Sequence, residues 1–472
     1  MAEEHRRRPH ALLLPLRGQG HMAPMMNVAF RLANHGVTIT LASFRKDISG
    51  IRSKYAKELH GLDFHLVELD FDPEESSSEV TLFGVMEGFR RGCLAYMEEL
   101  EADKQAGNNI PSCIIADFFY TWTEDVAMRL GMKCYVFFPS SATVPRLYQV
   151  VPELLETGKL QWREKNKNVK AFDGVLDIPG VGALKYSELP LFVREITGRV
   201  LAMNPGNRSI LVNTFYDLDS KAIDMYNEHF SSSESGAPKL YPIGPVITMP
   251  TDTDLAFNGT KDTEGADCMS WLDGQPAASV IYICLGSMAR LFPPQIKQLA
   301  QALEATENCR FLWVLHKGKG NFESLEEVLP PGFEEKVKGR GMVTTGWVPQ
   351  LQILAHSAIL GFLSHCGWGS TMESLTSAVP MIAWPQGADQ YLNCRTVVDE
   401  VKVAVEVVRD AEGIVQQKEF ERAFGILLGE ESKEMKMRSQ ELKAKGEAAI
   451  APGGSSERAL VQLVEEIKSY SS

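Results

Sequence analysis

The sequence lacks the cysteine pairs, the long apolar run and the basic surplus that mark several common protein classes. Its eight cysteines are spread over 472 residues, and no two lie close enough to form the C-x-x-C pair of a structural zinc site. So few cysteines fit reduced thiols in a cytoplasmic protein. No run approaches the ~20 apolar residues of a membrane span. The formal net charge of −13 argues against general binding to nucleic acid or anionic membranes.

The N-terminal region predicts no secretion signal. Its apolar stretch, residues 11–16, contains Pro15 and is too short for the apolar segment of a signal peptide. We therefore expect a cytoplasmic protein. Apolar residues make up 44% of the chain and charged residues 23%, an ordinary globular composition. The length suggests roughly two or three domains.

Short apolar runs alternate with helical patterns along the chain. A strand at 10–16, a Gly-rich turn, a helix at 22–35 and a strand at 37–43 form a βαβ unit, which implies a parallel sheet. Further strands are predicted at 112–117, 134–138, 209–213, 279–285, 310–315, 341–345, 359–364, 381–384 and 401–408. Further helices are predicted at 123–130, 221–229, 294–305, 351–356, 370–378, 417–448 and 457–470.

A composition shift separates two such series. Residues 249–265 are rich in Asp, Thr and Gly and predict a linker. We therefore expect one domain at 1–248 and another at 249–454, with a C-terminal helix at about 455–472 that packs back on the first. Two βαβ series predict an α/β protein of two doubly wound, Rossmann-like domains, with ligands at the C-terminal ends of the strands.

The strongest local pattern runs from Ser364 to Glu373, where a strand enters a Gly-bearing turn and a helix begins. Such a turn points unpaired backbone N–H groups at one spot, which suits a phosphate. Ser370 and Glu373 also match a capping box, so a helix cap with no ligand is the alternative.

Two loops that flank this turn offer groups that could contact a nucleobase and sugar hydroxyls. Trp347 lies beside Pro349 and could stack on a nucleobase, although a core tryptophan is the alternative. Asp389 and Gln390 end a later strand and could bridge sugar hydroxyls, although they could also form an ordinary polar turn.

Together these pieces span 44 positions, from Trp347 to Gln390, and resemble the signature box of plant-type UDP-sugar-dependent glycosyltransferases of small molecules. The matching residues are Trp347, Pro349, Gln350, His356, Phe362, His365, Gly367, Trp368, Ser370, Glu373, Ser374, Val379, Pro380, Pro385, Asp389 and Gln390. The resemblance extends to Gly20-His21, to 116–119, to 211–215 and to Gly286-Ser287. It implies the GT-B architecture, in which two Rossmann-like domains face each other across a deep cleft. The N-terminal domain would then bind the acceptor and the C-terminal domain the UDP-sugar.

The resemblance also implies roles for single residues. Trp347 would stack on uracil, and the backbone around Val348 and Gln350 would read its edge. Glu373 would bind the ribose hydroxyls. The residues implied for the diphosphate are Ser287, His365 and Ser370, and those implied for the sugar are Trp368, Asp389 and Gln390. A glutamine at position 390 tends to accompany UDP-glucose use.

Two positions depart from the family pattern. Gly369 stands where the family has an asparagine that assists the donor, so we expect weaker but surviving donor binding, since one neutral hydrogen bond is worth ~0.5–1.5 kcal/mol. Gly387 stands where an aromatic residue is frequent, which would enlarge the acceptor side.

A catalytic pair is expected in the first half. Transfer to a hydroxyl needs a base, and His21 follows the first strand where a ligand should bind. A structural histidine in a loop is the alternative, but the family's base matches this position. Asp117 ends another strand and matches the family's partner carboxylate, which orients the imidazole. Phe118 and Phe119, with Tyr120, follow it and could line an apolar acceptor pocket.

The resemblance thus implies an inverting, metal-independent transfer of glucose from UDP-glucose to a phenol, a flavonoid or a similar acceptor. UDP-glucose is a co-substrate, and no cofactor, metal or nucleic acid is expected. A monomer is our default.

Four other classes of protein are considered at this level. A metal-dependent transferase could use Asp217-x-Asp219 or Asp252-x-Asp254. A dehydrogenase is disfavoured because Gly18-x-Gly20 lacks the third glycine of G-x-G-x-x-G. A binding protein without turnover is conceivable because of Gly369, but the presence of both His21 and Asp117 argues against it. A hydrolase is disfavoured because no G-x-S-x-G turn occurs.

Overall fold

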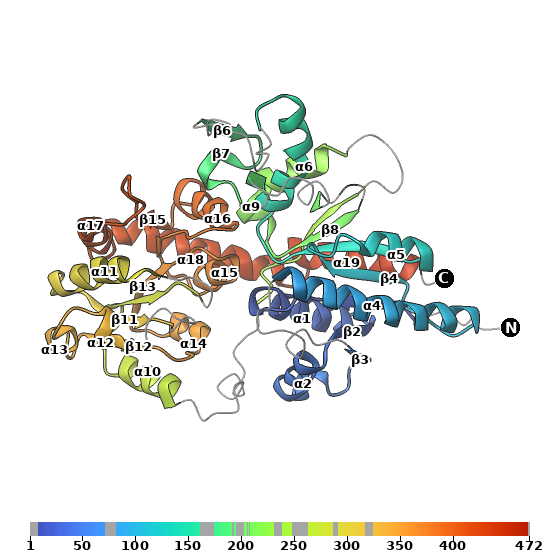
Figure 1. The fold of residues 1–472 in the computed structure, drawn as a ribbon, viewed down its shortest axis with the longest axis horizontal. Helices are drawn as coiled ribbons and strands as arrows, with labels where there is room; N and C mark the ends of the chain where they lie inside the picture. Colours follow the sequence, from blue (N-terminus) through green and yellow to red (C-terminus); the bar gives the residue numbers. More distant parts are fainter. Residues whose placement is uncertain are drawn as a thin grey trace. The chain divides into compact units, whose positions relative to one another are not determined.

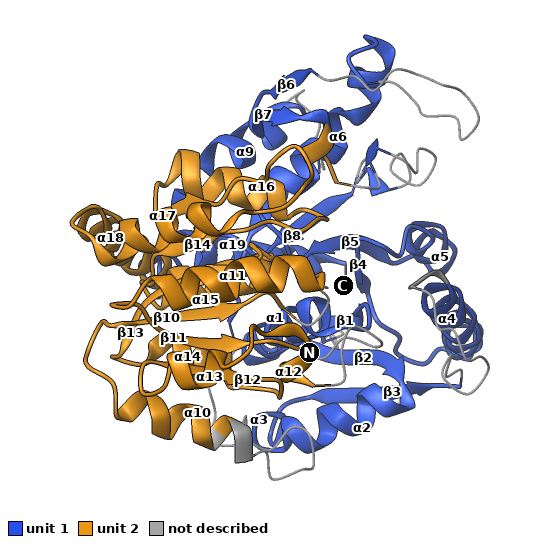
Figure 2. Ribbon diagram, turned by 60° about the vertical axis from the view of Figure 1, so that its left-hand side comes forward, with its two compact units in different colours: residues 1–186, 192–249, 448–472 blue, residues 187–191, 250–447 orange. Residues whose placement is uncertain are grey.

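Two parallel sheets organise the chain (Figure 1). The computed structural model describes residues 8–70, 82–160, 174–190, 193, 194, 203, 204, 206, 208–230, 238–247, 263–286, 291–316 and 324–470. They fall into two compact units, coloured in Figure 2: unit 1 holds 1–186, 192–249 and 448–472, and unit 2 holds 187–191 and 250–447.

Unit 1 is built on a seven-stranded sheet in the order β3-β2-β1-β4-β5-β8-β9. Its strands are β1 (His10–Leu14), β2 (Thr38–Phe44), β3 (Phe64–Leu69), β4 (Cys113–Asp117), β5 (Lys133–Phe138), β8 (Ser209–Val212) and β9 (Leu240–Pro242). Its helices are α1 (Gln19–Asn34), α2 (Arg45–Lys54), α3 (Ala56–Leu59), α4 (Leu82–Gln105), α5 (Thr123–Leu130), α6 (Thr143–Glu156), α9 (Tyr216–Glu228) and α19 (Ser455–Ser469). A separate hairpin pairs β6 (Val175–Ile178) with β7 (Gly182–Lys185) and leads into a short 3-10 turn, Tyr186–Glu188.

Alternate residues of the central strand β1 enter opposite halves of the core of unit 1. Ala11 and Leu13 join a cluster with apolar residues of α1, α2 and α19. Leu12 and Leu14 join a second cluster with residues of α4 and α5. A strand covered on both faces must be apolar at every position, which explains the continuous run ALLL.

The C-terminal helix α19 completes the first of these clusters. Leu460, Leu463, Val464 and Ile467 recur at helical spacing and are buried in it. Polar contacts fix the helix further, because Arg31 and His35 at the end of α1 both contact Glu457.

Unit 2 repeats the plan with a six-stranded sheet in the order β12-β11-β10-β13-β14-β15. Its strands are β10 (Val280–Cys284), β11 (Arg310–Val314), β12 (Gly341–Thr344), β13 (Ile359–Ser364), β14 (Met381–Ala383) and β15 (Ala404–Glu406). Its helices are α10 (Thr263–Asp273), α11 (Pro293–Ala305), α12 (Leu325–Val328), α13 (Phe333–Lys336), α14 (Gln350–Ala355), α15 (Trp368–Thr376), α16 (Gln390–Arg395), α17 (Gln417–Leu428) and α18 (Glu431–Ile450). A π-helical turn, Thr396–Glu400, follows α16, and the last residues of α18 belong to unit 1.

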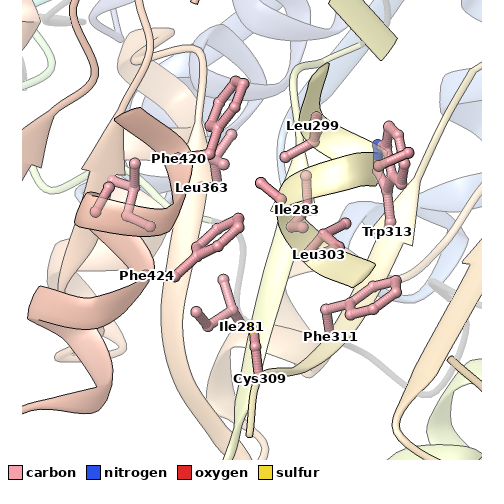
Figure 3. Packing of buried hydrophobic residues seen from close by; sticks show 14 of the residues in the cluster. Ile281, Ile283, Leu299, Leu303, Cys309, Phe311, Trp313, Leu363, Phe420 and Phe424 are labelled. Carbon is pink, nitrogen blue, oxygen red and sulfur yellow. The ribbon is translucent and has the colours of Figure 1, made fainter. Parts of the chain in front are cut away.

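One half of the core of unit 2 lies between the sheet and two helices. Figure 3 shows Leu299 and Leu303 of α11 and Phe420 and Phe424 of α17 gathered around Ile281, Ile283 and Leu363 of the strands. The alternate residues of β10, Val280, Tyr282 and Cys284, enter a second cluster that includes residues of α10 and α14. The predicted fold class, two doubly wound α/β units, is therefore confirmed.

The structure corrects several predicted elements. The helix after β1 begins at Gln19 and includes part of the predicted turn. The helix after β13 begins at Trp368, two residues before the predicted start. Strand β3 and helices α4 and α6 were not predicted. Strand β3 is an edge strand with half-exposed residues, so it lacks the apolar run that marks a central strand. Most of the predicted linker, including Asp252 and Asp254, lies outside the described residues.

A buried carboxylate anchors α6 in unit 1. The Oδ2 atom of Asp219 accepts a hydrogen bond of 2.9 Å from the backbone N–H of Ala142, directly before the helix. The backbone of Asp219 leaves the helical conformation within α9. Burial raises the pKa of Asp219 to about 6, although the hydrogen bond from Ala142 opposes the rise. Asp219 thus has a structural role.

The raised pKa of Asp219 predicts a pH-dependent stability. The folded state holds this proton up to about pH 6, whereas the unfolded state loses it near pH 4, so the free energy of unfolding should fall as pH rises between these values. Asp219→Asn keeps an acceptor for Ala142 and removes the titration. Urea denaturation should show the variant gaining roughly 2 kcal/mol relative to wild type between pH 4.5 and 7.5. Asp217→Asn, which removes an exposed charge nearby, is the matched control. A variant that tracks wild type at both pH values would contradict the assignment.

Candidate functional site

The two predicted catalytic residues meet at the ends of neighbouring strands in unit 1. Strands β1 and β4 pair side by side, with Leu14 opposite Ala116, so the chain leaves both at the same sheet edge. Gly18 has a φ of 127°, a left-handed conformation that only glycine adopts easily, and α1 starts directly after it. This places His21 in the first turn of the helix, where its Nδ1 lies 2.6 Å from Oδ2 of Asp117.

The surroundings of Asp117 define the tautomer of His21. The side chain of Asp117 is fully buried, and its second oxygen accepts a hydrogen bond of 3.1 Å from the backbone N–H of Phe119. An ionised carboxylate only accepts, so Nδ1 of His21 carries the proton and Nε2 is the basic nitrogen. The side chain of His21 is 26% exposed, which leaves its ring accessible to a substrate. The pair therefore has the chemistry of a general base.

Aromatic rings surround this base. Phe118 stacks at 6.0 Å from the ring of His21, and Phe119 lies tilted at 5.7 Å. Phe118 in turn stacks on Phe138. Both neighbours are half-buried and present an apolar surface beside His21. Tyr120 does not belong to this surface: it is buried, stacks on Phe89 and donates its hydroxyl to the backbone of Pro15. Its predicted place in an acceptor pocket was wrong, because its ring fills the core.

In unit 2, the turns after β10 and β13 meet around His365. Cys284 and Ser364 are register partners, so Gly286 and His365 emerge side by side. A side chain at Gly286 or Gly367 would clash with the imidazole, because a Cβ there would lie 2.8 or 2.4 Å from the ring. Burial lowers the pKa of His365 to about 4, so the ring is neutral at pH 7. Its Nδ1 is buried and has no hydrogen-bond partner among the described residues.

Helix α15 begins at this turn. Gly367 is the residue before the helix, and Thr371 is the first to donate to it, at 2.9 Å. The N–H groups of Trp368, Gly369 and Ser370 are therefore in the first turn, where the helix itself offers no acceptor. This geometry can bind a phosphate. The predicted capping box was wrong, because Ser370 lies inside the helix and bonds to another element.

The residue that bonds to Ser370 is Gln350, at the start of α14. Its side chain joins a cluster of polar groups beside α15. Its amide nitrogen donates to Oγ of Ser370 at 2.9 Å and to Oε2 of Glu373 at 2.6 Å. Burial raises the pKa of Glu373, and the hydrogen bond from Gln350 opposes the rise. The cluster presents a carboxylate held in one orientation, which can accept hydrogen bonds from a diol.

The sequence did not reveal a fourth member of this cluster, Tyr282. It lies in the middle of β10, is fully buried, and donates its hydroxyl to the amide oxygen of Gln350 at 3.2 Å. The amide of Gln350 is thereby fixed with its nitrogen toward Glu373. The only available signal was a tyrosine in an apolar strand, since a buried hydroxyl needs a partner.

The loop around Trp347, which is predicted to bind a nucleobase, exposes one aromatic ring and is anchored by a buried side chain. Trp347 is 38% exposed, whereas Val348 is buried in the core. The backbone N–H of Gln350 already donates to the carbonyl of Val348, within the loop itself. Trp368 is only 3% exposed, so little of this residue is available to a sugar.

The loop at 384–390 holds the remaining predicted sugar-binding residues. The amide oxygen of Gln390 accepts hydrogen bonds from the backbone of Gln386 and Gly387, at 2.8 and 3.0 Å. Its amide nitrogen is therefore the group that can donate to a sugar hydroxyl. Asp389 accepts a hydrogen bond from Asn393 at 3.1 Å.

Two predicted glycine positions are open. Apart from the adjoining backbone, no atom of the residues that the structure describes lies within 4 Å of a Cβ built on Gly369 or Gly387, and neither has a left-handed backbone. A larger side chain would therefore fit at either place. Ser287 lies outside the described residues.

Possible metal ligands are dispersed in the described part of the chain. No group of three His, Cys, Asp or Glu side chains there is arranged to hold an ion. Within Asp217-x-Asp219, the second carboxylate is buried against α6.

Comparison with known proteins gives consistent matches. Residues 239–444 match the family model described as UDP-glucoronosyl and UDP-glucosyl transferase. UDP-glycosyltransferase 72B1 of Arabidopsis thaliana is 30% identical, over 99% of this chain and 98% of that protein. Malvidin galactosylase UGT88C3 of Oryza sativa subsp. japonica is 30% identical, over 98% of each. The crystal structure of Medicago truncatula UGT71G1 complexed with UDP-glucose is 27% identical, with a TM-score of 0.79 over 99% of this chain and all of that one.

The helices that the structure describes include none with the length and apolar character of a membrane span.

Tyr282 provides a test of the polar cluster. Tyr282→Phe removes the donor to Gln350, so the amide loses its fixed orientation and Glu373 is held less well. Because one buried hydrogen bond is worth about 1 kcal/mol, we expect UDP to bind roughly five-fold more weakly, as measured by calorimetry. Tyr226→Phe is the matched control, since the buried hydroxyl of Tyr226 has no partner among the described residues. Equal UDP affinity in Tyr282→Phe and wild type would show that the orientation of Gln350 is immaterial.

Proposed function

The chain belongs to the plant-type UDP-glycosyltransferases of small molecules, and we propose that it moves glucose from UDP-glucose to a hydroxyl group of a small, largely apolar acceptor. It is an enzyme of the GT-B fold, so the dehydrogenase, hydrolase and binding-protein alternatives are set aside. The observation that carries the proposal is the His21–Asp117 hydrogen bond, in which a buried carboxylate leaves Nε2 as the basic nitrogen.

His21 would act as general base. Its Nε2 takes the proton of the acceptor hydroxyl while the oxygen attacks the anomeric carbon of glucose. Asp117 stabilises the imidazolium that forms, because its carboxylate is already hydrogen-bonded to Nδ1. Phe118 and Phe119 offer an apolar surface beside the base, which favours a phenolic or flavonoid-like acceptor.

The donor would bind to unit 2. Trp347 stacks on uracil, and Glu373, held by Gln350, accepts the ribose hydroxyls. The first turn of α15 and the neutral ring of His365 donate hydrogen bonds to the diphosphate. As the bond between the anomeric carbon and the phosphate oxygen breaks, these donors stabilise the negative charge on the departing UDP.

The transfer would invert the anomeric centre. The acceptor oxygen attacks the face opposite UDP, so an α-linked donor yields a β-glucoside. We propose that this step needs no metal ion, and that the protein acts as a cytoplasmic monomer. Glucose is favoured by Gln390, whose amide nitrogen is oriented by two backbone hydrogen bonds. Galactose is the second candidate, because one relative is named a galactosylase.

The base assignment predicts the effect of His21→Ala. Removal of a general base costs typically 10²–10⁴-fold, so kcat for glucosylation of a phenolic acceptor should fall by at least a hundred-fold. The Kd for UDP should stay within twofold of wild type, because this ring belongs to unit 1. His35→Ala, which removes a histidine that contacts Glu457 at the other end of α1, is the matched control. Near-normal turnover in His21→Ala would show that another group takes the proton.

Donor choice and metal independence can be read in one assay. Wild-type protein in EDTA should use UDP-glucose at least ten-fold more efficiently than UDP-galactose, measured as kcat/KM with a common phenolic acceptor. Gln390→His should narrow this ratio, because it replaces the oriented amide. Higher efficiency with UDP-galactose would overturn the glucose proposal, and activity that returns only with added Mg²⁺ or Mn²⁺ would overturn metal independence.

A further inference from the structure

The ring of Trp347 stacks against the ring of His316. No role has been given to His316 so far. The two ring centres are 6.5 Å apart, and the ring planes lie within 29° of each other. This is an offset stack in the range where aromatic pairs attract each other. His316 is half-buried, whereas Trp347 is 38% exposed, so the tryptophan keeps surface available for a ligand.

The contact follows from the strand register. Strands β11 and β12 pair in parallel, with Val314 opposite Thr344, and the N–H of Leu315 donates to the carbonyl of Thr344 at 2.8 Å. The residues that follow the two strands therefore emerge at the same sheet edge. His316 comes from one strand and Trp347 from the other.

The backbone beside the imidazole belongs to the same loop. Thr345, two residues before Trp347, acts on the ring through its backbone and raises the pKa of His316 against the effect of burial. Burial is the larger effect and lowers the pKa of His316, which favours the uncharged ring that stacks without the cost of burying a charge. His316 thus supports the exposed ring of the loop.

The other side of the loop is held by the core. Val348 is buried, and Gly265 of α10 lies so close that a Cβ there would be 3.4 Å from Pro349 and 3.7 Å from the carbonyl of Trp347. The backbone of the loop is thus anchored on one side, and the indole ring is supported by the imidazole.

We propose that His316 is a positioning residue for the nucleobase, because it holds the indole of Trp347 in place as a platform for uracil. The inference rests on the proposed function, since the ligand is the uridine part of the donor. Base stacking on an aromatic ring is strong only when the ring is already oriented, because any ordering of the ring upon binding weakens the affinity. His316 does that ordering beforehand.

The test compares two ligands on three variants of the full-length protein. His316→Ala removes the ring, and His316→Phe keeps a ring. His356→Ala is the matched control, because it removes another half-buried histidine of unit 2, which contacts Asp273 and the backbone of Ala358. Calorimetry measures the Kd for UDP and for inorganic pyrophosphate, which lacks the base.

We expect His316→Ala to weaken UDP binding about five-fold and to leave pyrophosphate binding within twofold of wild type. The KM for UDP-glucose should rise by a similar factor, while kcat at saturating donor stays within twofold. His316→Phe should restore most of the affinity for UDP. Equal losses for UDP and pyrophosphate, or no loss for either, would overturn the proposal.

A second measurement needs no ligand. The fluorescence of Trp347, one of seven tryptophans, is obtained by subtracting the signal of Trp347→Phe from that of the parent protein. Acrylamide should quench the fluorescence of Trp347 about twofold more strongly in His316→Ala than in wild type. In His316→Phe the quenching should equal that of wild type. Unchanged quenching in His316→Ala would overturn the support of Trp347 by His316. Failure of wild type to bind UDP would instead count against the donor site itself, so the two failures are distinguishable.

Discussion

The order of parallel strands is the constraint on which both sites depend. In each sheet the first strand lies between the next strand in sequence and a later one: β1 pairs with β2 and β4, and β10 pairs with β11 and β13. The pairs β1 with β4 and β10 with β13 thus join neighbours that are not consecutive in the chain. The chain leaves such a pair in opposite directions, so the ends of both strands stay uncovered by their own connections. His21 meets Asp117 at one of these points, and Gly286 meets His365 at the other.

Buried polar contacts then fix the orientation of the side chains at these strand ends. Asp117 is held by His21 and by the backbone of Phe119, and Gln350 joins Tyr282, Ser370 and Glu373. Burial raises the pKa of Glu373 and lowers that of His365, because each charged form loses contact with water. A diphosphate in unit 2 would thus meet helix N–H groups and a neutral ring.

The residues of the signature box, 347–390, have two kinds of role in this fold. Some present groups to a ligand surface, as Trp347 does with an exposed ring. Others only hold the framework: Nδ1 of His356 accepts the backbone N–H of Ala358, and Ser374 donates to the carbonyl of Val379. A matching motif identifies the family. The structure then shows which motif residues face a ligand surface and which only stabilise the fold.

The sequence by itself determined the two doubly wound units, the strand β13, the helix α5 and the choice of His21 and Asp117 as partners, because apolar runs and family motifs are local patterns. It did not predict the edge strand β3, the true start of α15 or the core position of Tyr120. Nor did it show that Tyr282 lies beside Gln350 or that His316 lies beside Trp347. Their partners are distant in sequence, 68 residues in the case of Tyr282 and Gln350. Only the strand register brings such residues together, since a hydrogen bond or a stacked ring requires closeness in space.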